Sequence, residues 1–594
     1  MTTRVDPAPP PTAAEDEAAP FERYRSPEAP VAAETWAWNM YGAGVEQIGR
    51  DGRPERLPVP EPGDDQLLVR VDAVGMCFSD VKLIQQGGRH PKLYNRDLAG
   101  EPTRLGHEAA LTVLRVGKQL RDRYAPGQRL AMQPDIYVDG RSTAYGYTIP
   151  GGLIQFHLIG PEVLAADDGA YVLPVPDELG YAETALTEPW ACVEGAYTQR
   201  RRLAPKPGGT MWIIGRRDDE GDYSFSRYAD APATVVLSDP PPAVAALFAG
   251  DPRVLRRDGL GPDEFAALRD ELTGGAGFDD IVVLDPTSAE LVGAAARLVA
   301  RRGTVNLVGR RPLDGEPLVD VGRIHYDYTA FVGSRGPDIA AAYGEERNRC
   351  ELRAGGVALF VGAGGPMGQM HVQRALELPD GPRTVIATDV NEGRLAALEA
   401  LFQPIARANG RRLLTLNPAS GHGALRELVE RETGGAGADD VVVSVPVAAL
   451  MAEAARLMRF DGMLVLFAGV PNGTMAPLNL SDVYLHGAQL TGTSGSRLSD
   501  QALVIDKTVA RQLSPNRSVA AVGGMAAAHD GIRAMMEGRY AGKVVIFPQL
   551  DDLPLMSLDE LREVHPDLAA HLGPDGQWTP AAERALIAKL WRPS

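Results

Sequence analysis

Cysteines are scarce in this sequence, and long apolar runs are absent. The 594 residues include three cysteines, Cys77, Cys192 and Cys350. Three widely spaced thiols form neither a disulfide framework nor a four-cysteine structural zinc site, and this pattern predicts a reducing, cytoplasmic setting. No run of about 18 or more apolar residues occurs, so we expect no membrane span.

Basic residues are also in deficit. The chain has 60 Lys and Arg against 78 Asp and Glu, which gives a net charge of -18. A field of that sign repels nucleic acid and anionic membranes, so neither is expected as a partner. The N-terminus lacks the basic start and apolar core of a signal peptide. Residues 1–34, rich in Pro and Ala, are predicted to form a disordered arm.

The chain is too long for a single core, and its first part is β-rich. Short segments between residues 35 and 205 alternate apolar and polar residues, with Gly, Pro and Asp between them. They include LLVRVDAVGMC (67–77), ALTVLRVG (110–117) and QRLAMQPDIYV (128–138). This pattern predicts a β-rich domain over 35–205.

Two later segments repeat each other. TGGAGFDDIVV (273–283) and TGGAGADDVVV (433–443) differ at two positions, and strand-like and helix-like segments follow the same order around both. Such alternation predicts parallel α/β sheets. We therefore predict two tandem Rossmann-like, doubly wound units, over 206–349 and 350–500, that arose by duplication.

The second Rossmann-like unit, over 350–500, contains the glycine turn that a dinucleotide requires. After the apolar strand GGVALFVG (355–362), the turn and the helix start comprise Gly362, Gly364, Gly365, Pro366, Met367 and Gly368. Glycines at this spacing let the backbone approach a pyrophosphate, which helix N-terminal N–H groups then bind. Asp389 ends the next strand, where an acid binds the adenosine ribose and favours NAD over NADP. Alternatively, Asp389 caps the following helix. Arg394 leaves open that the cofactor is NADP.

The first Rossmann-like unit, over 206–349, has GRRDDEGDYSF (215–225) at the corresponding place. Four carboxylates there would repel a pyrophosphate, and the glycine spacing is missing. We therefore expect this first Rossmann-like unit to have lost the ability to bind a dinucleotide. Arg216 and Arg217 leave open the binding of another anion.

Three separated segments of the β-rich domain contain residues that bind metal ions. GMCFSD, LGHE and LTEPWACV supply Cys77, Ser79, Asp80, His107, Glu108 and Glu188. A thiolate, an imidazole and one or two carboxylates suit a tetrahedral zinc with an exchangeable position. Such a zinc polarises an alcohol or carbonyl oxygen, and a neighbouring hydroxyl can carry the released proton. Taken singly, Cys77 and His107 are explained as well by burial in a core.

The three segments together resemble the zinc-dependent medium-chain alcohol and polyol dehydrogenases. In that family, G-x-C-x-[ST]-D, G-H-E and glutamate–proline segments come in this order. The resemblance continues through PGGLIQFHLIGPEVL (150–164) and returns in GIRAMMEGRYAGKVVIFP (531–548). TEPWACV and the segment from residue 551 also look like the L-sorbose-1-phosphate-reductase-type sugar dehydrogenases.

The resemblance implies a GroES-like catalytic domain with one catalytic zinc. The implied zinc ligands are Cys77, His107 and Glu108, with Glu188 either as a ligand or as the residue that holds the zinc-bound water. It also implies that Ser79 relays the proton and that Asp80 orients the site. The implied reaction is NAD-linked hydride transfer between a secondary alcohol and a ketone on a polyol, cyclitol or sugar phosphate. The GroES-like domain and two Rossmann-like sheets together make an α/β fold.

Several alternatives stay open at this point. The glycine spacing also allows a zinc-free quinone or enone reductase of the same superfamily, and the fold allows a non-catalytic binding protein. Lys82, Arg89 and His90 either bind a substrate phosphate or form a solvated loop.

The remaining segments predict further features of the organisation. Residues 501–548 are predicted to return to the catalytic domain, and 549–594 to form a tail that docks through Trp578. We expect unit 206–349 to act as an internal partner for unit 350–500, a pseudo-dimer, or to shape substrate entry. A homo-oligomer also stays open.

Overall fold

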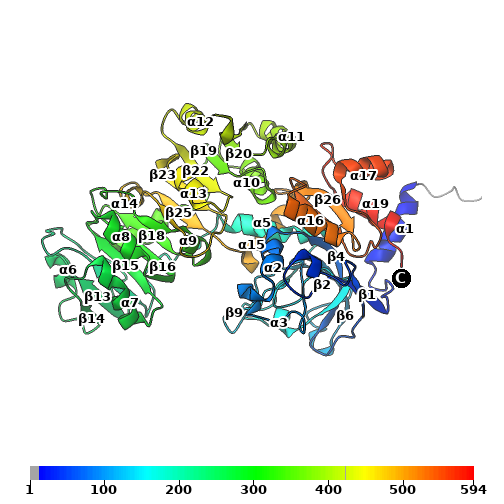
Figure 1. Cartoon of the computed structure of the whole chain (residues 1–594), viewed down its shortest axis with the longest axis horizontal. Helices are drawn as coiled ribbons and strands as arrows, with labels where there is room; N and C mark the ends of the chain where they lie inside the picture. Colours follow the sequence, from blue (N-terminus) through cyan, green and yellow to red (C-terminus); the bar gives the residue numbers. More distant parts are fainter. Residues whose placement is uncertain (1–12, 422, 594) are drawn as a thin grey trace, which may run out of the picture. The chain divides into compact units, whose positions relative to one another are not determined.

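The computed structural model describes residues 13–593 apart from residue 422, and these form two units (Figure 1). The first unit consists of residues 13–191 and 496–593, and the second of residues 192–495. Figure 1 draws the first unit in blue, cyan, orange and red, and the second mostly in green and yellow. The chain from residue 496 onward therefore belongs to the same unit as the N-terminal part.

An eight-stranded sheet forms the centre of the first unit. Its strand order is β11-β7-β6-β4-β27-β26-β28, and β10 also pairs with β4. The strands are β4 Leu67–Gly75, β6 Glu108–Val116, β7 Arg129–Met132, β10 Phe156–Ile159, β11 Val172–Pro174, β26 Val519–Gly524, β27 Lys543–Phe547 and β28 Met556–Ser557. β27 pairs antiparallel with β4, so the return segment completes the sheet that carries the N-terminal motifs.

Short strands and helices surround this sheet. The strands are β1 Glu34–Ala37, β2 Asn39–Met40, β3 Glu55–Pro58, β5 Thr103–Arg104, β8 Tyr137–Val138 and β9 Arg141–Ser142. The helices are α1 Ala13–Arg25, α2 Phe78–Gln86, α3 Pro161–Leu164, α4 Tyr181–Ala185, α5 Thr187–Gly195, α15 Leu498–Val509, α16 Ala528–Glu537, α17 Leu558–Val564, α18 Pro566–Ala569 and α19 Pro580–Leu590.

Helix α1 corrects the expectation of a disordered arm over 1–34. Residues 1–12 lie outside the described part of the chain, but Ala13–Arg25 is helical. Tyr24 is 1% exposed, and its hydroxyl donates a hydrogen bond of 2.6 Å to Asp72. The guanidinium of Arg70 lies 3.8 Å from the centre of the Tyr24 ring. One buried aromatic ring with a satisfied hydroxyl anchors a segment whose composition otherwise predicts disorder.

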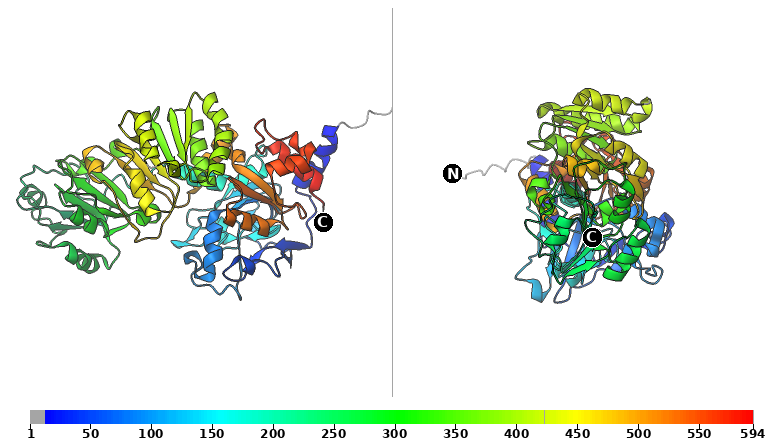
Figure 2. Two further views of the ribbon diagram at one scale, coloured as in Figure 1. Left: turned by 45° about the horizontal axis from the view of Figure 1, so that its top comes forward. Right: turned by 90° about the vertical axis from the view of Figure 1, so that its left-hand side faces the viewer.

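The C-terminal tail packs against the rest of the first unit. Trp578 is 1% exposed within a hydrophobic cluster of this unit. Trp591 packs edge-on against Tyr24, with 5.3 Å between ring centroids. Helix α19 lies beside α1, so the two ends of the described chain cover the same face of the first unit (Figure 2).

The second unit contains two six-stranded parallel sheets of identical topology. We call residues 206–349 the first copy and residues 350–495 the second copy. Their strand orders are β14-β13-β12-β15-β16-β18 and β21-β20-β19-β22-β23-β25. Strand for strand, the two copies follow the same path, which confirms the predicted tandem Rossmann-like sheets.

The elements of both copies lie close to the predicted positions. The first copy contains β12 Thr210–Ile214, β13 Thr234–Ser238, α6 Pro242–Leu247, β14 Val254–Arg256, α7 Phe265–Thr273, β15 Phe278–Leu284, α8 Ala289–Ala296, β16 Val299–Val308, β17 Leu318–Asp320, α9 Val321–Tyr326 and β18 Ala330–Ser334. The second copy contains β19 Val357–Val361, α10 Pro366–Glu377, β20 Thr384–Thr388, α11 Glu392–Ala408, β21 Arg412–Leu416, α12 Ala424–Thr433, β22 Ala438–Val443, α13 Ala448–Ala455, β23 Met458–Leu466, β24 Met475–Pro477, α14 Ser481–Leu485 and β25 Gln489–Gly492.

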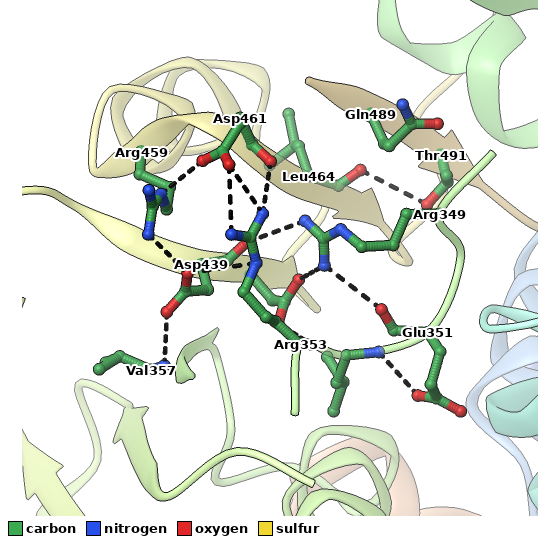
Figure 3. Close-up of polar contacts among 12 residues, drawn as sticks. Arg349, Glu351, Arg353, Val357, Asp439, Arg459, Asp461, Leu464, Gln489 and Thr491 are labelled. Atoms are coloured by element: carbon green, nitrogen blue, oxygen red, sulfur yellow. Dashed lines mark hydrogen bonds and ion pairs between the residues drawn. The ribbon is translucent and has the colours of Figure 1, made fainter. Parts of the chain in front are cut away.

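The repeated motif has the same structural role in each copy. In the second copy, Asp439 Oδ2 accepts the N–H of Val357, the first residue of β19, at 2.8 Å (Figure 3). The next residue, Asp440, accepts the N–H of Arg353 at 2.7 Å and pairs with the guanidinium of Arg349. The two carboxylates therefore fasten the segment that enters the second copy to β22, the fourth strand of this copy in chain order.

The first copy repeats these contacts with different cations. Asp279 Oδ2 accepts the N–H of Thr210, the first residue of β12, at 2.9 Å. Asp280 accepts the N–H of Lys206 at 2.9 Å and a guanidinium N–H of Arg202 at 3.2 Å. The motif occurs twice because each sheet needs its entry segment fixed at the amino ends of the strands.

The two copies face each other in a reciprocal manner. Edge strands β18 and β25 lie against each other, and β17 of the first copy pairs antiparallel with β24 of the second. Helix α14 of the second copy packs on β18, where a Cβ added at Gly333 would lie 2.4 Å from Tyr484 Cβ. Helix α9 of the first copy packs on β25, where a Cβ at Gly492 would lie 3.1 Å from His325 Cα. One hydrophobic core runs through both copies.

Within the described residues, no helix has both the length and the apolar character needed to cross a bilayer.

Candidate active site

The first unit brings Cys77, His107 and Glu108 together. Cys77 precedes helix α2, and Glu108 is the first residue of β6, which pairs with β4. One ligand atom from each of the three residues lies within 4.8 Å of the others. In the described part of the chain this is the single cluster of at least three His, Cys, Asp or Glu with metal-binding spacing. The structure thus joins residues that the sequence placed in two separate motifs.

Hydrogen bonds fix the orientation of the His107 ring. Nδ1 lies 3.1 Å from Asp80 Oδ1, and because the carboxylate accepts, Nδ1 carries the proton and leaves Nε2 as a ligand atom. Ser79 Oγ lies 3.3 Å from Nε2 and donates to Cys77 Sγ at 3.0 Å. Burial lowers the pKa of His107, but Asp80 and Cys77 together raise it well above its ordinary value. The surroundings of this ring therefore favour a positive charge.

Glu108 has one oxygen paired and one oxygen without a partner. Its Oε1 accepts from the ammonium of Lys543, and both side chains are almost fully buried. Its Oε2 is buried and has no hydrogen-bond partner. Gly75, opposite Glu108 in the β4–β6 pair, leaves room for this oxygen, because a Cβ there would lie 2.0 Å from it. A buried carboxylate oxygen without a donor, beside a thiolate and an imidazole nitrogen, fits a zinc ion.

Glu188 lies near the cluster but outside it. This residue of helix α5 is 5% exposed. Burial raises the pKa of Glu188 to about 7, His107 opposes that shift and Glu108 adds to it. The three-residue cluster does not include Glu188, so this geometry supports a carboxyl that acts beside the ligands. Its role as a ligand stays a prediction.

The sequence did not predict a group of polar and aromatic side chains beside the metal-binding residues. We call this group the polar wall; it consists of Tyr147, His90, Lys92 and Asp135. Tyr147 is buried, with its ring centre 5.8 Å from His107 and 5.3 Å from His90. Lys92 Nζ lies 4.9 Å from the Tyr147 ring centre and 3.0 Å from Asp135 Oδ1. Burial and the charge of Lys92 lower the pKa of His90 to about 4, so the ring is neutral at pH 7. Of the three residues proposed from sequence as a phosphate site, His90 alone joins this wall, while Lys82 and Arg89 are exposed.

Lys543 illustrates why the sequence did not predict every residue next to the zinc ligands. Lys543 lies 435 residues after Glu108, and no local motif links it to the zinc ligands. The closing segment AGKVVIF, which was recognised as part of the resemblance, was the one available signal for Lys543.

The glycine turn of the second copy is open at its helix N-terminus. Gly362 follows β19, and Pro366 and Met367 begin helix α10, with Gly365 as its N-cap. A Cβ added at Gly365 would meet no heavy atom within 4 Å, whereas one at Gly368 would lie 2.5 Å from Gly362 O. The turn therefore leaves space for a phosphate above the helix while the helix packs closely on the strand.

A groove next to this turn has the character of an adenosine site. It has a volume of about 420 Å³ and its lining includes Gly362, Asp389, Val390 and Leu450. Val390 is 71% exposed and Leu450 39% exposed, which leaves apolar surface for an adenine ring. Asp389 Oδ2 accepts the N–H of Gly364 at 3.0 Å, and its Oδ1 accepts that of Asn391 at 2.9 Å. Asp389 thus stands at the edge of the glycine turn, where the sequence placed it.

The corresponding place in the first copy is filled by its own charged side chains. No helix lies between β12 and β13, although every residue between them is described. Arg216 pairs with Asp285 at 3.2 Å, and Arg217 pairs with Asp239 at 2.7 Å. With the helix missing and both guanidinium groups neutralised, the first copy has no phosphate-binding feature of the kind found in the second.

Comparison with known proteins gives a consistent result. Residues 63–177 match the family described as "Alcohol dehydrogenase GroES-like domain". An L-sorbose 1-phosphate reductase from Klebsiella pneumoniae is 30% identical over 51% of this chain and 75% of that protein. A mannitol-1-phosphate 5-dehydrogenase from Aliivibrio fischeri is 23% identical over 91% of this chain and 95% of that protein. A sorbitol dehydrogenase from Macaca fascicularis is 28% identical over 44% of this chain and 72% of that protein.

Proposed function

Because this chain belongs to the zinc-dependent medium-chain alcohol and polyol dehydrogenases, we propose that it is an NAD-linked oxidoreductase of a polyol, cyclitol or sugar phosphate. It is an enzyme of the dehydrogenase type and an oxidoreductase. The observation that carries the proposal is the convergence of Cys77, His107 and Glu108 in the same chain as an open glycine turn. We propose a cytoplasmic location, because three widely spaced cysteines form no disulfide framework.

The metal-binding residues would hold a single catalytic zinc. Cys77 Sγ, His107 Nε2 and Glu108 Oε2 are the proposed ligands, and Glu188 is the proposed fourth ligand or the holder of a water. A bound zinc supplies a Lewis acid that polarises the substrate oxygen. Asp80 keeps His107 in the tautomer that ligation requires.

Proton transfer falls to the side chains next to the ligands. Ser79 Oγ contacts both Cys77 Sγ and His107 Nε2, so it lies where a substrate hydroxyl would give up its proton. His90 lies beyond Tyr147, but its pKa, lowered to about 4, makes the ring a weak base, so we assign the proton relay to Ser79. A bound nicotinamide cofactor would supply the redox chemistry as the hydride acceptor.

We propose that only the second copy binds the dinucleotide. Gly362, Gly364, Gly365 and Gly368 would border the pyrophosphate, and Asp389 would bind the ribose hydroxyls and disfavour NADP. The first copy would serve as an internal partner that covers edge strand β25, which makes the pair a pseudo-dimer within one chain.

A substrate screen tests the proposal. The purified chain is assayed for NAD reduction with polyols, cyclitols and sugar phosphates, before and after a chelator, together with a zinc determination. We expect one zinc per chain and loss of activity with chelation. Cys77→Ser should lose both zinc and activity, while the matched control Cys192→Ser, a half-buried thiol outside the cluster, should keep both.

Two outcomes would replace this function with another. Turnover of a quinone or enone that persists without zinc would establish the zinc-free reductase. Failure of the wild-type chain to bind NADH or NAD at millimolar concentration would establish the non-catalytic binding protein.

A further inference from the structure

Two backbone carbonyls of the second copy are held by side chains of the first copy. His325 Nδ1 lies 3.2 Å from the carbonyl oxygen of Leu466, and because that oxygen can only accept, Nδ1–H is the donor. The hydroxyl of Tyr328 donates to the carbonyl oxygen of Ser494. His325 is 7% exposed. Both donors belong to the copy that has no phosphate-binding turn.

These carbonyls stand at one end of the second sheet. Leu466 is the last residue of β23, and Ser494 follows the last residue of β25 by two positions. In a doubly wound sheet the ligand lies at the carboxyl ends of the strands, and each half of the sheet receives one nucleotide. The adenosine groove lies at the half made by β19, β20 and β21. The ends of β22, β23 and β25 are therefore the place for the nicotinamide half.

At this end of the second sheet, the contact between the two copies leaves no room for a side chain at Gly469. A Cβ at Gly469 would lie 2.4 Å from Tyr326 Oη and 2.8 Å from His325 Nε2. The backbone that follows β23 thus rests directly on the side chains of His325 and Tyr326 in helix α9. A shift of α9 would move residues 466–469 with it.

The reciprocal contact provides a built-in comparison. Tyr484 in α14 of the second copy occupies the place that His325 occupies in α9, and its hydroxyl donates to the carbonyl of Arg311 at 2.5 Å. Arg311 follows β16 of the first copy. Each copy therefore supports the strand ends of the other, but only one of the supported ends belongs to a copy with an open glycine turn.

We propose that the first copy is a positioning element for the nicotinamide half of the cofactor, acting through His325 and Tyr328. The inference rests on the proposed function of the second copy as the NAD-binding unit. Neither residue touches the substrate or zinc. Both hold backbone that borders the nicotinamide, and so keep the ring in one orientation.

The test separates the two halves of the cofactor. Isothermal titration measures the affinity of the zinc-loaded, full-length chain for NADH and for ADP-ribose, which lacks the nicotinamide. Tyr328→Phe removes one hydroxyl and should weaken NADH binding about 3- to 12-fold, the effect of one part-buried hydrogen bond. Its affinity for ADP-ribose should stay within twofold of wild type, which also shows that the adenosine half is folded.

Two further variants sharpen the result. His325→Phe should weaken NADH binding like Tyr328→Phe, and His325→Asn, whose amide can donate to the same carbonyl, should restore most of it. Tyr484→Phe removes the reciprocal bond to the first copy and should leave both affinities unchanged.

Each remaining outcome is decisive. If wild type binds no NADH, the proposed function fails, and this inference fails with it. If wild type binds NADH but Tyr328→Phe binds it equally well, or loses ADP-ribose to the same extent, then only the positioning role is overturned.

Discussion

The twin aspartates of the repeated motif allow a controlled test of what that motif does. Asp440 is fully buried, accepts the N–H of Arg353 and pairs with Arg349, and Asp280 makes the same pair of contacts in the first copy. Burial raises the pKa of both carboxyls, and the guanidinium partners oppose that shift. We predict that Asp440→Asn and Asp280→Asn destabilise their own copies equally and leave cofactor binding intact.

The size of the effect follows from the contacts that are lost. Asparagine keeps one acceptor oxygen but places an amide donor against a guanidinium or a backbone N–H. Removing one partner from a fully buried ion pair costs about 3–5 kcal/mol, and a charge-assisted hydrogen bond contributes about 1.5–3 kcal/mol. The side chains of Arg349 and Arg202 are about a quarter exposed. Solvent screens their charge, so we expect about 2–3 kcal/mol for each variant.

Local amide hydrogen exchange is the suitable measurement, because a chain with several domains has no single free energy of unfolding. Asp440→Asn should speed exchange in β19 about 30- to 150-fold, which corresponds to about 2–3 kcal/mol, and leave β12 unchanged. Asp280→Asn should do the reverse. The motif lies at the amino ends of the strands, away from the dinucleotide, so NADH affinity should stay within twofold. Weaker NADH binding with unchanged exchange in β19 would refute the structural role of the motif.

Three further predictions concern other parts of the chain. The Tm of the first unit is followed as the temperature at which β4 and β27 lose their protection from amide exchange. Lys543→Met should lower this Tm by several degrees in zinc-free protein and by less in zinc-loaded protein, since a cation then neutralises the buried partner carboxylate. Lys589→Met, from an exposed pair, should change neither. The pKa of His371 is lowered to about 3, mainly by burial. As the pH falls, the unfolded chain therefore takes up this proton before the folded chain does. The unfolding free energy of the second copy should be constant above about pH 6.5 and fall by about 1.4 kcal/mol per pH unit down to about pH 3. His371→Gln should remove this slope, measured by amide hydrogen exchange of α10. Asp389→Ser should shift the ratio of NADPH to NADH affinity at least about tenfold toward NADPH, while Asp239→Ser in the first copy should shift nothing.

Each of these predictions has a definite contrary result. Equal Tm losses with and without zinc would show that Lys543 does not compensate the same carboxylate as the metal. An acid slope that survives in His371→Gln would assign it to another group. The N-cap of α11 is Asn391, so Asp389 does not cap that helix. Unchanged nucleotide preference in Asp389→Ser would leave Asp389 with only its hydrogen bonds to the N–H groups of Gly364 and Asn391.

Motifs with local causes were predictable from the sequence. The strands from GGTMWIIG to GMLVLFAG are short apolar runs with glycine or aspartate at their ends, and each forms a strand near its predicted position. The duplication was visible because both copies need the same glycine turn and the same two aspartates. The family was recognisable because zinc ligation restricts residue type and spacing within GMCFSD and LGHE, and the relatives confirm it.

Features that depend on distant pairing were not predictable. Nothing near residue 24 signals that Tyr24 would bury its ring against Arg70, so the N-terminal helix was taken for a disordered arm. Lys543 and Glu108 meet only because β27 pairs with β4.

The sequence by itself determined the fold class, the tandem repeat and the residue types of the proposed zinc and dinucleotide sites, because each leaves a local pattern: alternating strand and helix segments, a repeated glycine turn, and short motifs of restricted residue type. Only the tertiary structure decided that His325 and Tyr328 of the first copy hold carbonyls of the second, that Glu108 keeps one oxygen free of donors, and that both chain ends close one face of the first unit. Those contacts join residues far apart in the chain, and their partners are selected by packing, which leaves no periodic or local mark in the sequence.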